Sequence, residues 1–351
     1  MVGTSELRSA DSTPIALVRP APVLHFPGAN RSSPDKPGET DCNSPMHWDA
    51  NKLYLFNSAG HPWRSSGTDL LHLTNKYVRC EFDDSANGGR WIEATWKEDG
   101  GMLYGWYHLE PKGLCPTARL TAPRIGAVRS LDNGAHWQDL GIILAAPTNS
   151  LRCDTPNHYF AGGYGDFSVM ADPRRDFLYF FFSAYNGGAS QQGVAVARIR
   201  FADLDAPAGK VWKWFDGVWS GRGLDGPVSP IFPVAIDWHR FDASAFWGPS
   251  IHYNAHLARY VLLLNHAQDS DWTQEGVYVS FADNLNDPRK WTKPKKILGD
   301  LRKDEWYPQV AGTRKGETDK YVGQVSRLFL RGESRWDLLF LKPGEKPTAS
   351  Q

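Results

Sequence analysis

Five stretches of the sequence repeat one order of features: an apolar strand, a polar turn, and a second apolar strand that contains a tyrosine. The turns are rich in Gly, Asp and Asn, a combination that is typical of β-hairpins. The repeats span residues 41–56, 91–107, 162–185, 246–264 and 306–323. Their unequal spacing indicates loop insertions between units of one kind.

Additional strands are expected behind these hairpins. Third strands are predicted at residues 125–130, 193–197 and 276–280, and fourth strands at 140–144, 211–214 and 296–298. Four strands per unit, repeated at intervals of several tens of residues, are typical of a β-propeller. The sequence therefore predicts an all-β fold with five blades of four antiparallel strands. An irregular β-sandwich fits less well, because the turn, the tyrosine and the third strand recur in the same order.

The ends of the chain are predicted to meet in the last blade. Residues 1–40 form an arm rich in Pro, Ser and charge, with one strand candidate at 23–26. Residues 41–345 are predicted to form a single propeller domain. A segment of the arm is expected to complete the last blade, whose third strand is predicted at 327–330, since closure removes exposed sheet edges.

Composition excludes some classes of partner. The formal net charge is zero, which argues against nucleic acid as the main partner. No apolar run is long enough to cross a bilayer. Residues 1–10 lack an apolar signal core, which fits a cytoplasmic protein or a secreted or periplasmic one whose signal has been removed. No oligomeric state is predicted.

The aromatic and cysteine contents give two further expectations. The chain has 15 Trp, 13 Tyr and 17 Phe, which suits a sugar-binding surface, although core packing should account for most of them. The four cysteines match no zinc motif. Cys115 and Cys153 lie in loop-like contexts where they could form a disulfide.

Residues 130–137 match the pattern S-x-D-x-G-x-x-W, which is called the Asp-box. This element resembles one found in sialidases and other propeller enzymes. The Asp-Asn-Gly sequence at its centre is a strong hairpin signal. Asp132 is therefore predicted to be structural and to lie away from the active site.

Propeller geometry separates the carboxylates into two groups. The start of each first strand and the loop after each second strand lie on one face, and the first turns lie on the other. The carboxylates in first turns are therefore predicted to be solvated turn formers. They are Asp49, Asp99, Asp172 and Asp176.

Four carboxylates on the first face are the candidate catalytic residues. Asp41, Glu93 and Asp166 open first strands, and Glu110 follows a second strand. Asp166 is the strongest candidate, because its glycine-rich loop allows a ligand to approach closely. Its alternative role is to accept hydrogen bonds from its own loop. The alternative role of Glu93 is a buried ion pair with an arginine.

Polar and aromatic residues of the same face are candidates for substrate binding. They are His108, Arg124, His158, Tyr159, Trp247, Asn265, His266, Glu275 and Tyr307. The histidines are expected to form hydrogen bonds with substrate rather than to act as general bases. Their spacing indicates no metal site and no cofactor is predicted, while a structural cation in the channel stays open.

The five hairpins, with one acid opening blade one and another opening blade three, resemble the five-bladed propeller glycoside hydrolases. These include the arabinanases and xylosidases of family 43, the invertase and levansucrase group, and the anhydrogalactosidases. The resemblance covers residues 41–341. It implies that a blade-one Asp acts as base or nucleophile, that a blade-three Asp tunes a pKa or holds the sugar, and that a blade-four Glu is the acid.

These roles carry over unevenly to this sequence. Asp41 matches the first role loosely, because the usual Asp-Pro is replaced by a sequence that reaches proline only at position 45. Asp166 matches the second role well. The third role is unmatched, since Trp247 stands where the Glu would be. The acid must then come from elsewhere, with Glu110, Glu93 and Glu275 available, or the activity departs from that of the family.

We therefore expect a glycoside hydrolase that cleaves a furanoside or a related plant or microbial glycan with a pair of carboxyl groups. Two alternatives remain open. One is a non-catalytic carbohydrate-binding propeller, and the other is a metal-dependent propeller lactonase or lyase.

Overall fold

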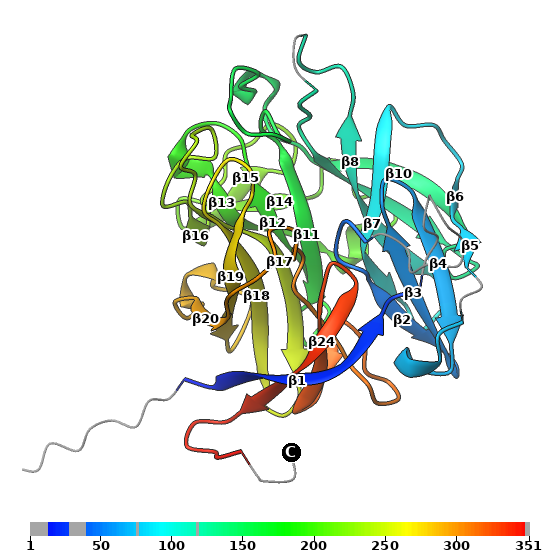
Figure 1. The fold of residues 1–351 in the computed structure, drawn as a ribbon. Helices are drawn as coiled ribbons and strands as arrows, with labels where there is room; N and C mark the ends of the chain where they lie inside the picture. The colour runs from blue at the N-terminus through cyan, green and yellow to red at the C-terminus, as the bar shows by residue number, and fades with distance from the viewer. Residues whose placement is uncertain (1–12, 28–39, 75–76, 117–118, 348–351) are drawn as a thin grey trace, which may run out of the picture.

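A computed structural model describes residues 13–27, 40–74, 77–116 and 119–347 of the chain. These residues form five separate antiparallel sheets that follow one another along the chain (Figure 1). The prediction of an all-β, five-bladed propeller is confirmed. Helical residues in the described part are limited to short 3-10 turns, and none of them is long and apolar enough to cross a membrane.

The first two blades follow the predicted hairpin order. Blade one consists of β2 (Met46–Asp49), β3 (Lys52–Ser58), β4 (Pro62–Gly67) and β5 (Val78–Arg79). Blade two consists of β7 (Gly88–Lys97), β8 (Leu103–Pro111), β9 (Arg124–Ser130) and β10 (His136–Leu144), with β6 (Glu81–Phe82) parallel to β10 at its outer edge.

Blades three and four carry additional short strands. Blade three consists of β11 (Tyr164–Ala171), β12 (Phe177–Ala184), β13 (Gly193–Arg200), β14 (Trp212–Phe215) and β15 (Val218–Arg222), and β16 (Phe232–Pro233) also pairs with β13. Blade four consists of β17 (Ala245–Asn254), β18 (Arg259–Ala267), β19 (Gln274–Ala282) and β20 (Lys295–Leu298).

Blade five differs from the prediction. It consists of β21 (Gln309–Ala311), β23 (Val325–Leu330), β24 (Glu333–Leu341) and β1 (Ile15–His25). The second strand is therefore β23, and the predictions of a second strand at 320–323 and a third at 327–330 are wrong. The segment β22 (Tyr321–Val322) instead pairs in parallel with β17 of blade four. The longer apolar run of β23 offers more side chains to bury than the two residues of β22.

The outer strand of blade five comes from the N-terminal part of the chain. β1 runs antiparallel to β24, with Ile15 opposite Leu341 and His25 opposite Glu333. Figure 1 shows these two strands side by side, one from each end of the chain. The pairing covers an edge of β24 that would otherwise be open to other chains.

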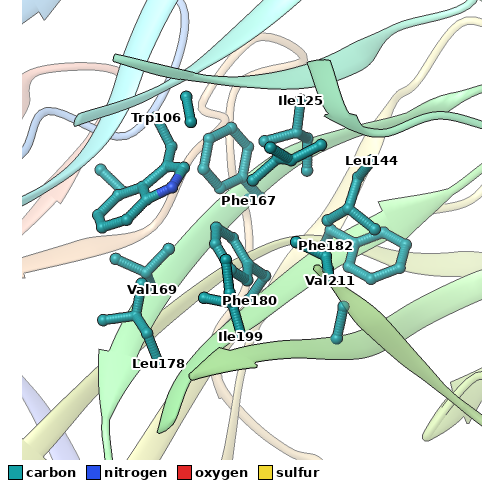
Figure 2. Packing of buried hydrophobic residues seen from close by; sticks show 14 of the residues in the cluster. Trp106, Ile125, Leu144, Phe167, Val169, Leu178, Phe180, Phe182, Ile199 and Val211 are labelled. Carbon is teal, nitrogen blue, oxygen red and sulfur yellow. The ribbon is translucent and has the colours of Figure 1, made fainter. Parts of the chain in front are cut away.

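The second strand of blade three, β12, is the most apolar strand of the sequence and lies between two hydrophobic cores. Along β12, Leu178, Phe180 and Phe182 pack toward blade two, and the alternating Tyr179 and Phe181 pack toward blade four. Figure 2 shows the first of these faces packed among side chains of the neighbouring strands. Each fully buried aromatic contributes about 1.5–3 kcal/mol. A strand between two cores has no polar face, so its sequence is apolar throughout.

Two of the four cysteines are bonded to each other. Cys115 and Cys153 form a disulfide between the loop after β8 and the loop before β11. The pairing that the sequence left open is therefore present. Cys42 and Cys80 are free and buried.

Candidate active site

The inner strands of three blades are interrupted by β-bulges. The register shifts between Ile92 and Ala94 in β7, between Gly165 and Phe167 in β11, and between Trp247 and Ser250 in β17. A bulge leaves one residue unpaired and turns its side chain in a new direction. Glu93 and Asp166 occupy two of these positions, and Asp166 has a positive φ of 44°.

Side chains form hydrogen bonds with backbone groups at the bulges. Glu93 Oε2 accepts a hydrogen bond of 2.6 Å from the amide of Phe167. The Asn43 side-chain amide donates to the carbonyls of Phe167 at 3.0 Å and Pro249 at 3.2 Å. These bonds connect the inner strands of blades two, three and four with the segment that enters blade one. The bulged segments are therefore tied to one another by hydrogen bonds.

His108 lies at the centre of three carboxyl groups. Its Nδ1 is 3.5 Å from Glu93 Oε1 and 3.9 Å from Asp166 Oδ1, and its Nε2 is 3.3 Å from Glu110 Oε1. Burial alone would lower the pKa of His108, but these carboxylates raise it to about 9. The Asp166 amide donates to Nδ1 at a nitrogen–nitrogen distance of 3.1 Å, and this hydrogen bond requires an unprotonated Nδ1, so it is lost when the ring is charged.

Two tyrosines hold Asp166 from the other side. Tyr307 Oη donates to Asp166 Oδ1 at 3.1 Å, and Tyr185 Oη donates to Asp166 Oδ2. Burial raises the pKa of Asp166, while the His108 charge and these two hydroxyl groups oppose the rise. The amide of Tyr307 is itself bound by Asn265 Oδ1 at 2.8 Å. Asn265 thus positions the tyrosine that positions the carboxylate.

A cavity of about 860 Å³ opens beside this buried cluster. Asp41 and Glu110 are the acids in its wall. Burial raises the pKa of Asp41 to about 6, and the opposing charge of Arg331 limits the rise. The remaining wall residues are Ala59, Gly60, Gly88, Gly89, Trp91, Pro111, Lys112, Gly113, Arg119, Leu120, Thr121 and Arg331.

The four candidate catalytic carboxyls thus form two layers. Asp41 and Glu110 line the cavity, whereas Glu93 and Asp166 are each only 2% exposed and lie in the buried cluster. His108, which is 3% exposed, connects the two layers through its contacts with Glu110 and Glu93. The structure brings these five candidate residues together, in two layers that the sequence did not separate.

Other candidate residues lie outside the cavity wall. Trp247 has no exposed surface and packs against Trp272 and Tyr307, so it supports the site and presents no face to a ligand. Tyr159 is exposed, with ring-edge contacts to Trp272 and Trp306. His158 pairs with Asp271 at 3.0 Å on the outer surface.

His266 and Glu275 belong to a different cluster, on blade four. His266 Nδ1 is 3.7 Å from Glu275 Oε2, and Glu275 also pairs with Lys296 and accepts a hydrogen bond from Tyr278. Arg124 begins β9 and is not part of the cavity wall. Glu275 is likewise not among the residues of the cavity wall.

Sequence reasoning missed Arg331 and Tyr185. Arg331 directly follows β23, so it would have been a candidate if that segment had been recognised as a second strand. Tyr185 directly follows β12, the second strand of blade three. The rule that residues after second strands reach this face could therefore have found both.

One group of ligand atoms in the described residues is compact enough for a metal ion. Glu93, His108 and Asp166 each place one such atom within 4.8 Å of the others. A protonated His108 opposes a cation at this position, and Glu93 already accepts the Phe167 amide. The residues would suit a divalent ion only if His108 lost its proton.

Comparisons with known proteins identify the fold. No protein-family profile matches the chain, and no curated protein matches its sequence. A thermostable family-43 glycoside hydrolase has a TM-score of 0.52 and 10% identity over 87% of this chain and 95% of its own. An exo-β-1,3-galactanase from Phanerochaete chrysosporium, solved with β-1,3-galactotriose, has a TM-score of 0.51 and 11% identity over 91% of this chain. The matched part spans 64% of the length of that galactanase. The chain therefore shares the five-bladed propeller fold of family-43 glycoside hydrolase structures.

Proposed function

We propose that this protein is a glycoside hydrolase whose carboxyl pair is Asp41 and Glu110. The observation that carries the proposal is that both carboxyls line a single cavity of about 860 Å³. Cleavage of a glycosidic bond requires two carboxyl groups on opposite sides of the bond. The likeness in fold to family-43 hydrolases supports the same reaction class.

The surroundings of the two groups favour different roles. Burial raises the pKa of Asp41 to about 6, which suits a general acid that protonates the leaving oxygen. Glu110 faces the charged ring of His108 and is therefore the better carboxylate to activate water or to attack the anomeric carbon. This assignment reverses the role that the family resemblance implied for Asp41.

The buried residues are proposed to set these roles without touching the substrate. Asp166 and Glu93 favour the charged form of His108, whose Nε2 lies 3.3 Å from Glu110 Oε1. Glu93 cannot be the acid, because its carboxyl group is enclosed by Phe167 and His108. Glu275 lies in the separate cluster on blade four.

The substrate class is proposed to be a furanoside or a related glycan, and the galactanase likeness adds β-1,3-galactan to the candidates. The test is a screen of aryl furanosides, aryl pyranosides, arabinan and β-1,3-galactan. On any substrate that is turned over, Glu110→Gln should lower kcat by about 10²–10⁴-fold. Asp41→Asn should do the same on substrates with poor leaving groups, and much less on aryl glycosides with good ones.

Three outcomes would contradict the proposal. One is binding of glycans without turnover, which would indicate a carbohydrate-binding propeller. Another is full activity of the Glu110→Gln variant with intact folding. The third is loss of activity in chelator with recovery on adding a divalent ion, which would favour the metal-dependent alternative at Glu93, His108 and Asp166.

A further inference from the structure

The cavity wall has more positive than negative charges. It contains the two carboxyls Asp41 and Glu110 and the three cations Lys112, Arg119 and Arg331. The whole chain, by contrast, has 39 basic and 39 acidic residues. In a working hydrolase one carboxyl of the pair is protonated, so a single negative charge then faces three positive ones.

The positive charge of Arg331 already has partners within the protein. Its Nη1 pairs with Asp304 Oδ2 at 2.9 Å, and its charge acts on Asp41. Lys112 and Arg119 are different, because both are exposed and neither forms an ion pair with any residue in the described ranges. Their charges are therefore available to a ligand in the cavity.

The two cations lie on a segment that is fastened to the propeller. Lys112 comes directly after β8, and Cys115 between the two cations is bonded to Cys153. Thr121 Oγ1 donates to the carbonyl of Pro111 at 2.8 Å, and the Thr121 amide donates to the carbonyl of Tyr159 at 3.0 Å. Both ends of the segment are thus anchored, which reduces the entropy lost when its side chains bind a ligand.

We infer that the glycan carries an anionic group, a carboxylate or a sulfate ester, and that Lys112 and Arg119 bind this group. The guanidinium of Arg119 can form paired hydrogen bonds with two oxygens of either group, and the ammonium of Lys112 adds a point charge. Lys112 lies two residues beyond Glu110, about 7 Å along an extended chain. The anionic group therefore belongs to the sugar at the cleaved bond or to its neighbour.

This inference rests on the proposed function only for the nature of the ligand, so its test measures binding separately from turnover. The probes are oligogalacturonate, a sulfated galactan oligomer and a neutral galactan oligomer of equal length. Calorimetric titration should give at least tenfold tighter binding for one anionic probe than for the neutral one. The preferred probe distinguishes a carboxylate from a sulfate.

The decisive variant is Lys112→Gln/Arg119→Gln. It should weaken binding of the preferred anionic probe at least tenfold and change binding of the neutral probe less than twofold. Raising salt from 50 to 200 mM should weaken the wild type and leave this variant nearly unchanged. The matched control is Lys293→Gln/Lys295→Gln, which removes two exposed positive charges beside β20 and should bind all probes like the wild type.

The possible failures can be told apart. Equal binding of anionic and neutral probes, or equal loss of both in the Lys112/Arg119 variant, would overturn the inference. If an anionic probe binds through these residues but no anionic glycan is hydrolysed, the subsite stands and the proposed hydrolase activity fails. Hydrolysis of a glycan together with equal binding of the anionic and neutral probes would have the opposite meaning: the hydrolase activity would stand and the anionic subsite would fail.

Discussion

The Oε2 atom of Glu93 accepts a hydrogen bond of 2.6 Å from the amide of Phe167, and this bond joins the inner strands of blades two and three where both are bulged. Burial raises the pKa of Glu93 well above its usual range. A carboxyl in this position supports the fold by pairing the Phe167 amide. The proposed reacting groups are therefore the two carboxyls in the cavity wall, Asp41 and Glu110.

Shortening Glu93 should destabilise the protein more than neutralising it. Glu93→Ala leaves the buried Phe167 amide without a partner and opens a void, which should lower the free energy of unfolding by about 2–4 kcal/mol. Glu93→Gln keeps an oxygen for the amide and should lower it by less than about 1.5 kcal/mol. Urea unfolding of both variants measures the difference, and equal losses would show that the Phe167 contact is unimportant.

Replacement of Asp166 should act on His108. Asp166→Asn removes one of the carboxylates that raise the pKa of His108, so this pKa should fall below the wild-type value of about 9. Activity should fall with it, because the proposed mechanism places the positive charge of His108 beside Glu110. NMR titration of the His108 ring measures the shift. Tyr185→Phe is the control, since it keeps the Asp166 charge and removes one hydrogen bond. Full activity of folded Asp166→Asn would exclude Asp166 from the mechanism.

The sequence predicted the architecture well because most strands of a blade pair with strands that are close to them in the sequence. Hairpins such as residues 162–185 bring their strands together over short distances, and their turns and alternation are visible in the sequence. Blade five was misread because its first and second strands, β21 and β23, are separated by a segment that pairs with blade four. That exchange depends on the closed ring and leaves no periodic signal.

The sequence predicted which residues could form the candidate site, but not which of them line the cavity and which are buried behind it. Propeller geometry placed Asp41, Glu93, Glu110 and Asp166 on one face, but it could not separate the wall of a cavity from the cluster behind it. That difference comes from the bulges in β7 and β11, which turn Glu93 and Asp166 inward. A bulge adds one residue to a strand, and a single sequence contains no partner strand against which that residue can be counted.

The activity should depend on the protonation of Asp41. As the general acid it must be protonated, and its pKa is raised to about 6, so kcat/KM should fall as pH rises through about 6. The charge of Arg331 lowers this pKa, so Arg331→Gln should move the falling limb to higher pH. The measurement is kcat/KM against pH for the wild type and Arg331→Gln. A limb that rises through pH 6 would show that Asp41 is the base instead.

Reduction of the disulfide should loosen the cavity wall and leave the propeller folded. Cys115 and Cys153 anchor the segment that carries Lys112, whereas the five sheets do not depend on this bond. Mild reductant should therefore raise KM several-fold with little change in kcat or in the far-ultraviolet spectrum. Cys115→Ser/Cys153→Ser should reproduce the effect without reductant. Insensitivity of KM in both experiments would contradict the anchoring role.

Acid should destabilise the fold through a histidine buried without a partner. His252 lies in β17 with no exposed surface, neither ring nitrogen has a hydrogen-bond partner in the described structure, and burial lowers its pKa to about 3. In the unfolded chain, the pKa of a histidine is near 6.5. Its stabilising contribution is therefore complete above pH 6.5 and is lost as pH falls toward 3, by about 1.4 kcal/mol per pH unit.

The test is His252→Leu, which removes the titrating group and fills the same space with carbon atoms. The difference in free energy of unfolding between variant and wild type should grow as pH falls from 6.5 to 4. His47, whose pKa is also lowered to about 3, remains in both proteins and cancels in the comparison. A difference that stays constant with pH would mean that His252 does not resist protonation in the folded protein.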